Sequence, residues 1–125
     1  VPGQENARPR HPKARSMKLN KIPFATTEWA GIPREEKSAA AGQAFWRTQT
    51  LGEVRVRMVE YTPGYVSDHW CTKGHVLLCL SGELHTELAD GRQYTLTPGM
   101  SYQVADNAEP HRSTSPQGAT LFIVD

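Results

Sequence analysis

Closely spaced turn signals constrain the fold of this chain more than any other feature of its sequence. Four turn-forming dipeptides interrupt the second half of the chain: Pro63-Gly64, Ser81-Gly82, Asp90-Gly91 and Pro98-Gly99. Proline presets the backbone for a turn, and glycine adopts the left-handed conformations that many turns require. Short strands with turn signals about every 8–12 residues predict an all-β sandwich or barrel.

The segments between these turns carry strand patterns. Residues 53–61 alternate apolar and charged side chains, as a half-exposed strand does. Asp90-Gly91 is the strongest hairpin signal in the sequence. The other predicted strands are 75–80, 83–88, 92–96, 100–104 and 121–124. Residues 18–46 predict a wrapping segment whose short strands and aromatic residues pack on the barrel, and residues 38–41 favour one helical turn.

The charge is unevenly distributed along the 125 residues. The formal net charge is +1, but residues 1–21 hold six basic side chains against one acidic, and the remainder holds eight against twelve. Residues 1–16 include three prolines and almost no apolar side chains, which predicts a flexible basic tail or a vector-derived remnant. The single predicted domain, residues 17–125, is mildly acidic and therefore gives no electrostatic case for nucleic acid.

Cysteine content and hydropathy bear on the location of the protein. Cys71 and Cys79 are the only cysteines, which does not make a secreted disulfide framework. We therefore expect a reducing compartment, the cytoplasm. No apolar run approaches the roughly 18 residues of a membrane span, so we expect no membrane partner.

One octapeptide, residues 68–75, gathers metal-binding side chains. Side chains alternate along a strand, so His69 and Cys71 point the same way, and a turn at Lys73-Gly74 brings His75 back beside them. Two imidazoles and a thiol suit zinc, iron, nickel or copper. In a simpler interpretation the cysteine is a small buried hydrophobe, and the histidines are surface or core residues.

The spacing of this octapeptide resembles the first motif of the cupin family. That motif runs glycine, about five residues, His-x-His, three or four residues, Glu, six residues and glycine. Gly64, His69 and Gly82 match it, while Cys71 replaces the second histidine and His75 replaces the glutamate. The run 68–71 also looks like a subgroup of small cupins with a DHCW-like motif. The resemblance implies a cupin-type double-stranded β-helix, a jelly-roll barrel, with an extended N-terminal segment.

The second cupin motif is matched less closely. Gly99 matches its first glycine, and His111 matches its histidine after one extra residue. Ala105 replaces the proline, Asn107 the second glycine and Ser115 the asparagine. These departures weaken the motif but keep the one residue of it that can bind a metal.

The resemblance implies a metal site made of His69, Cys71, His75 and His111. A cupin site offers three neutral imidazoles and one carboxylate, and here a thiolate supplies the anionic donor. Its softness favours zinc, iron, nickel or copper over magnesium or manganese. Such a site predicts a small organic ligand or substrate in the barrel mouth, and dioxygenase or isomerase chemistry if the protein is an enzyme. Candidate acids or bases, none in a motif, are Tyr61, Tyr102 and Glu109.

Two alternatives from other classes remain open, a metal-free small-molecule-binding module and a dimeric interaction protein. The second rests on the apolar run 76–80. Alternation places Val76, Leu78 and Leu80 on one face of the strand. His75, Leu77 and Cys79 lie on the other face. Both faces are apolar and need cover, so we expect a homodimer that covers the outer one.

Overall fold

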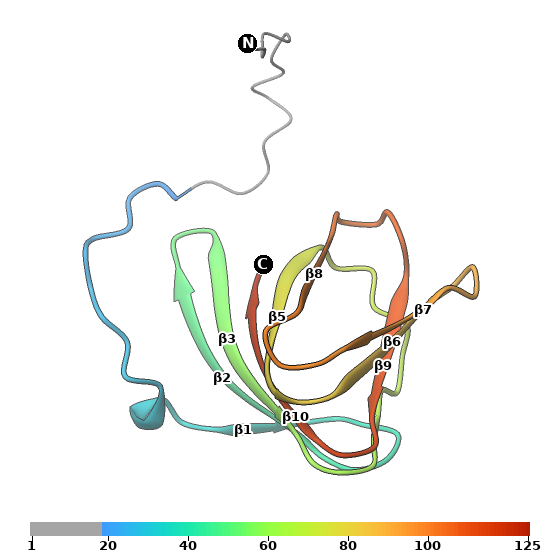
Figure 1. Ribbon diagram of the computed structural model, residues 1–125. Helices are drawn as coiled ribbons and strands as arrows, with labels where there is room; N and C mark the ends of the chain where they lie inside the picture. The colour runs from blue at the N-terminus through green and yellow to red at the C-terminus, as the bar shows by residue number, and fades with distance from the viewer. Residues whose placement is uncertain (1–18) are drawn as a thin grey trace, which may run out of the picture.

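The protein is described by a computed structural model over residues 19–125, whose strands form two antiparallel sheets. The strands are β1 (Glu35–Lys37), β2 (Ala44–Leu51), β3 (Val54–Tyr61), β4 (Tyr65–Val66), β5 (His75–Gly82), β6 (Leu84–Leu88), β7 (Gln93–Leu96), β8 (Ser101–Val104), β9 (His111–Ser115) and β10 (Ala119–Val124). The larger sheet has the order β1-β2-β3-β10-β5-β8 and the smaller β4-β9-β6-β7. Figure 1 shows both sheets curving around a shared interior.

The six strands predicted at residues 53–61, 75–80, 83–88, 92–96, 100–104 and 121–124 are present, with ends that lie within two residues of the predicted ones. The pattern does not predict β2, β4 or β9. The helical turn predicted at residues 38–41 is wrong. The amides of Ala40 and Ala41 donate to the carbonyl of Val66, at 2.8 and 3.4 Å, and are thus committed to a sheet-like bridge. Within residues 19–125, the only helical element is the 3-10 turn η3 (Trp29–Gly31).

The two faces of β5 separate as the alternation predicts. His75, Leu77 and Cys79 are buried, whereas Val76 and Leu80 are 47% and 42% exposed. The buried face joins the hydrophobic core, which side chains of β3, β5, β6, β7 and β10 build. The outward face of β5 is therefore an apolar surface that the described part of the chain covers only in part.

Strand β3 turns its arginines toward the interior. Arg57 is only 5% exposed and lies on the same face as Val59, which is fully buried. Met58, on the opposite face, lines a shallow surface depression together with Trp29. The alternation in the sequence is real, but the charged face of this strand is the inner one. This orientation places positive charge inside the barrel.

The segment before β1 runs along the outside of the larger sheet, past β2 (Figure 1). Trp29 packs edge-on against Phe122 of β10, with 6.2 Å between the ring centroids. Arg47 of β2 donates to three carbonyls of the segment, of which that of Ile32 is nearest at 2.6 Å. The predicted packing of aromatic residues is correct for Trp29 and wrong for Phe24, which is 96% exposed.

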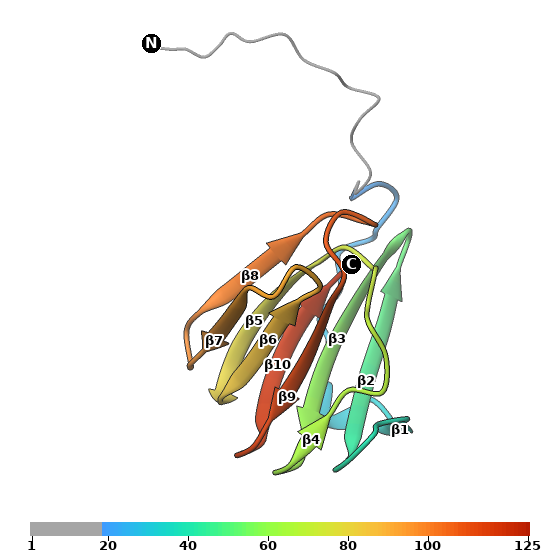
Figure 2. The ribbon, with the colours of Figure 1, turned by 90° about the vertical axis from the view of Figure 1, so that its right-hand side faces the viewer.

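Figure 2 looks onto the smaller sheet with the larger sheet behind it. The interior between the two layers holds both the core and the candidate site described below. The predicted basic tail, residues 1–16, lies outside the described residues. Within residues 19–125 there is no helix with the length and apolar content to cross a bilayer.

Candidate metal and ligand site

A cavity of about 360 Å³ is lined by side chains from both sheets, and all four predicted metal ligands reach it. Leu77 and Ile123 belong both to the cavity lining and to the hydrophobic core, so the cavity opens directly onto the core. Its volume falls in the range of about 300–1,000 Å³ that is typical of sites for small organic molecules.

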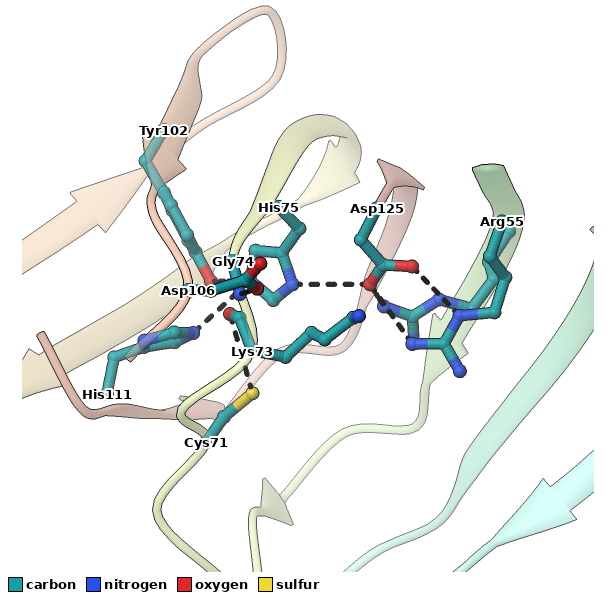
Figure 3. A network of polar contacts seen from close by, with 10 residues as sticks. Arg55, Cys71, Lys73, Gly74, His75, Tyr102, Asp106, His111 and Asp125 are labelled. Carbon is teal, nitrogen blue, oxygen red and sulfur yellow. Dashed lines mark hydrogen bonds and ion pairs between the residues drawn. The ribbon is translucent and has the colours of Figure 1, made fainter. Parts of the chain in front are cut away.

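Strand register brings three charged or titratable groups into line at one end of the larger sheet. Val124 of β10 pairs with Val76 of β5, so the next residue, Asp125, lies opposite His75. On its other side, Asp125 exchanges backbone hydrogen bonds with Arg55 of β3, at 2.6 and 2.9 Å. The carboxylate therefore stands between an imidazole and a guanidinium, as Figure 3 shows.

Cys71 reaches the site through a bridge to a distant strand. The predicted strand, turn and strand over residues 68–75 is wrong, because only His75 lies in a regular strand. Cys71 instead forms an isolated antiparallel bridge with His111, with N–H···O distances of 2.7 and 3.0 Å. Backbone pairing between residues forty positions apart thus brings the thiol of Cys71 close to the imidazole of His111.

The loop that precedes His111 locks onto the same segment. The amide of Gly74 donates to the carboxylate of Asp106 at 2.7 Å, and the amide of Asn107 donates to the carbonyl of Thr72 at 2.8 Å. A Cβ at Gly74 would overlap the backbone nitrogen of Asp106, so only glycine permits this approach. The loop and the start of β5 therefore hold both buried histidines in fixed positions.

The two buried histidines approach each other through their Nε2 atoms, 3.2 Å apart. His111 places its Nδ1 2.9 Å from the carbonyl oxygen of Glu109. A carbonyl can only accept, so we assign the proton to Nδ1. The Nδ1 of His75 lies 3.7 Å from a carboxylate oxygen of Asp125, beyond hydrogen-bond distance, and is buried without a hydrogen-bond partner among the described residues. The Nε2 atoms of the two rings and the hydroxyl of Tyr102 come together at one point.

This spacing matches a pair of ligands on one metal ion. Two nitrogens at about 2.0–2.1 Å from a zinc ion, with an angle of about 90–110° between them, are about 2.9–3.4 Å apart. Two neutral imidazoles that turn lone pairs toward each other repel unless a proton or a cation lies near both. The Nδ1 of His111 also faces the carbonyl oxygen of Glu109, the arrangement that orients metal-ligating histidines, whereas the Nδ1 of His75 has no such hydrogen bond. The spacing of the two Nε2 atoms is therefore compatible with a metal ion.

The thiol of Cys71 is activated by its neighbours. A hydrogen bond with His111 lowers the pKa of Cys71, burial opposes this shift, and the backbone at Lys73 and the two nearby histidine charges support it. The same hydrogen bond raises the pKa of His111. A thiol with a lowered pKa is more readily present as the thiolate, which is the form that binds metals.

His69 stands apart from the other three predicted ligands. Its side chain is 69% exposed, and its Nδ1 lies 2.7 Å from the carboxylate of Asp68. It lines the cavity but does not contact the buried histidine pair. Across residues 19–125, no cluster of three or more His, Cys, Asp or Glu side chains has the arrangement of a completed metal site. The structure thus brings two donors into ligand spacing and holds two further donors in the same cavity.

The three candidate acids or bases differ in position. Tyr102 points its hydroxyl at His75 Nε2, 3.1 Å away, and burial raises the pKa of Tyr102 well above its usual value. The hydroxyl is therefore a hydrogen-bond donor to the imidazole. Tyr61 also lines the cavity and is stacked on Tyr65, with 3.7 Å between ring centroids. Glu109 is exposed and pairs with an arginine outside the cavity.

The sequence patterns do not predict the ion-pair group of Arg55, Arg57 and Asp125 beside the cavity. Asp125 accepts from Arg55 at 2.8 and 3.0 Å and from Arg57 at 2.8 Å. Burial alone raises the pKa of Asp125, but hydrogen bonds with neighbouring side chains and the charges of both arginines hold it well below its usual range. The only signal in the sequence is the pair of arginines on alternate positions of one strand, and its acidic partner follows some seventy residues later.

No protein-family model matches the chain, and no curated protein does so either. Solved structures do match. An RmlC-like cupin from Shewanella frigidimarina NCIMB 400 is 20% identical with a TM-score of 0.64, over 83% of this chain and 91% of that one. A sugar phosphate isomerase of the cupin superfamily from Silicibacter pomeroyi is 17% identical with a TM-score of 0.64, over 80% and 74%.

A third structure, Fe(II)-HppE with the alternative substrate (S)-1-HPP, is 16% identical with a TM-score of 0.68. The match covers 82% of this chain, which spans only 60% of the length of HppE. Identities this low show the fold alone. The predicted cupin-type jelly roll is therefore confirmed, while membership of the DHCW-like subgroup stays a prediction.

Proposed function

We propose that the cavity binds a divalent transition metal through His75, His111 and Cys71, with His69 as a fourth ligand from the mouth, and that it takes a small organic ligand. The observation that carries this proposal is the 3.2 Å approach of the Nε2 atoms of His75 and His111, which matches the spacing of two ligands on one metal ion. A turn of the Cys71 and His69 side chains toward the pair completes the ligand set.

The donor types support a soft or borderline metal. Two or three neutral imidazoles with one thiolate suit zinc, iron(II), nickel or copper. The thiol of Cys71 is already shifted toward its anionic form by His111. Fe(II)-HppE shares the fold, which is consistent with iron in a barrel of this kind.

If the site is catalytic, we propose dioxygenase or isomerase chemistry. A metal held by these residues would supply a Lewis acid that could polarise a substrate oxygen, or a coordination position for dioxygen. Tyr102 contributes a buried hydroxyl 3.1 Å from His75 Nε2. With that nitrogen on a metal ion, the hydroxyl would be free to donate to a bound ligand. Leu77 and Ile123 supply an apolar part of the lining.

A metal-free binding module is the second candidate, and one observation favours it. His75 Nε2 already has two polar neighbours, the hydroxyl of Tyr102 at 3.1 Å and the Nε2 of His111 at 3.2 Å. A single proton shared by the two imidazoles would satisfy this cluster. The cavity would then recognise its ligand through hydrogen bonds alone.

Metal content decides between the two. The protein is purified, incubated with zinc, iron(II), nickel or copper, desalted, and its metal per chain is measured. We expect about one metal ion per chain in the parent and at least about a tenfold weaker affinity in His111→Gln, because one of the two preformed donors is lost. His85→Gln is the matched control, since His85 bonds to Glu83 and Thr95 outside the cavity. A parent that retains none of the four metals would refute the proposal in favour of the binding module.

A further inference from the structure

The cavity lining is strongly basic although the chain around it is not. Five basic side chains line it and no aspartate or glutamate does, within the part of the chain that the structure describes: Lys37, Arg55, Arg57, Lys73 and Arg112. After residue 21 the sequence holds twelve acidic side chains against eight basic ones. Most of the positive charge of this acidic domain is therefore concentrated around one cavity.

The innermost of these charges is only partly compensated. Arg57 has a side chain that is 6% exposed, and it shares the single carboxylate of Asp125 with Arg55. Its Nε atom is buried and has no hydrogen-bond partner in the described structure. Desolvation lowers the pKa of Arg57, which shows that burial penalises the charged form here more than the carboxylate relieves it. A buried positive charge that is only partly compensated costs free energy, and an anion bound nearby would recover part of it through its charge.

Aromatic packing holds the arginines in place. The guanidinium carbon of Arg57 lies 4.2 Å from the ring centroid of Trp46, and that of Arg55 lies 5.3 Å from it. At the mouth, Arg112 lies over the ring of Trp70 at 4.3 Å. A stacked guanidinium keeps its in-plane N–H donors free for a planar acceptor. Figure 3 shows Arg55 and His111 on opposite sides of His75, and all three residues line the same cavity, so a ligand there meets both kinds of group.

We propose that this cavity takes a small organic anion, whose carboxylate or phosphate group is held by Arg57, Arg55 and Lys73 while its uncharged part faces the histidine pair. The inference deepens the proposed function, because it assigns the ligand class of the same cavity. The charged groups that carry it are distinct from the proposed metal ligands, so it can be tested with or without metal. Arginine forks bind carboxylates and phosphates with two parallel hydrogen bonds, so the two anions share one chemistry.

The test is calorimetric titration of the metal-free protein with three probes, namely benzoate, phenyl phosphate and benzyl alcohol. The first two place a carboxylate or a phosphate on the same ring, and the third is neutral. We expect at least one anion to bind about tenfold more tightly than benzyl alcohol, and its Kd to rise with added KCl. The stronger of the two anions identifies the preferred group.

Charge-removing variants locate the binding. Lys73→Gln and Arg112→Gln change exposed side chains and should leave the fold intact, while Arg57→Gln removes the buried donor. We expect each to weaken anion binding by about threefold or more, since each removes a charge that lines the cavity. Arg34→Gln is the matched control, because Arg34 pairs with Glu60 outside this cavity, and it should bind like the parent.

The outcomes separate this inference from the metal proposal. If benzyl alcohol binds as well as the anions do, or if the cavity variants bind like Arg34→Gln, the anion site is wrong. Anion binding that occurs only with metal present, and is unchanged in Arg57→Gln, would assign the anion to the metal and also overturn it. If the protein holds no metal but still binds benzoate or phenyl phosphate through these residues, the anion site stands and the metal proposal falls.

Discussion

Replacing Asp125 by asparagine should strongly destabilise the fold. The side chain is 1% exposed and accepts three hydrogen bonds from two guanidinium groups. Asparagine has nearly the same shape but leaves Arg57, 6% exposed, as a buried charge without a counterion. Removing one partner of a buried ion pair typically costs about 3–5 kcal/mol. Arg55 adds little to this figure because its side chain is more exposed.

Thermal unfolding followed by circular dichroism measures the effect. For a domain of about a hundred residues, 1 kcal/mol corresponds to a shift in Tm of about 4 °C, so the expected loss is about 12–20 °C. Asp90→Asn is the matched control, because Asp90 also pairs with an arginine but is 56% exposed, and exposed pairs contribute about 0–1 kcal/mol. The double variant Asp125→Asn with Arg57→Met removes both buried charges and should recover part of the loss.

The effect also has a pH dependence with a defined sign. The pKa of Asp125 is lowered in the folded protein, so its contribution is fully present above its unfolded value of 3.8. It is lost as the pH falls through the lower folded value. The Tm difference between parent and Asp125→Asn should therefore be constant near neutral pH and shrink below about pH 4. A difference near neutral pH no larger than that of Asp90→Asn would refute the argument, because it would mean that Arg57 needs no counterion.

The remaining predictions concern the thiols, one turn and the outer face. Cys71→Ser should lower bound metal at least about tenfold with the fold intact, whereas Cys79→Ser should cost about 1–3 kcal/mol of stability with metal content unchanged. Gly82→Ala should cost more than about 2 kcal/mol, because φ is +76° and a Cβ there would overlap a backbone carbonyl. Gly91→Ala, with φ +98° but open space around it, should cost about 1 kcal/mol. Light scattering at tens of micromolar should report a dimer through the outward face of β5, and a monomer would contradict this.

Much of the fold can be predicted from local patterns. Turn dipeptides and alternation locate β5 to within two residues and identify which of its faces is buried. This works because side chains alternate along any strand, so the pattern carries its own geometry. Strand β2 escapes prediction because apolar and polar side chains occur on both of its faces, and β9 because all of its side chains are polar. Only pairing with β3, and with β4 and β6, makes them strands.

The candidate site, like the fold, could be predicted from the sequence only in part. The sequence by itself determined the donor types and the start of β5 at His75. It did not determine which donors converge, because the 3.2 Å approach of His75 to His111 depends on a bridge between residues forty positions apart. His69 shows the consequence, since it stands two positions from Cys71 and yet is exposed.

The inner face of β3 was decided by the tertiary structure alone. Alternating valines and arginines predict a half-exposed strand, and both orientations are consistent with that pattern. The arginines face inward because Asp125, at the end of the neighbouring β10, supplies a carboxylate there. Burying a guanidinium without such a partner is too costly for it to happen. The local sequence predicts which face of a strand is buried only when one face is apolar. In β3 the carboxylate of Asp125, distant in sequence, allows the arginine face to be the buried one.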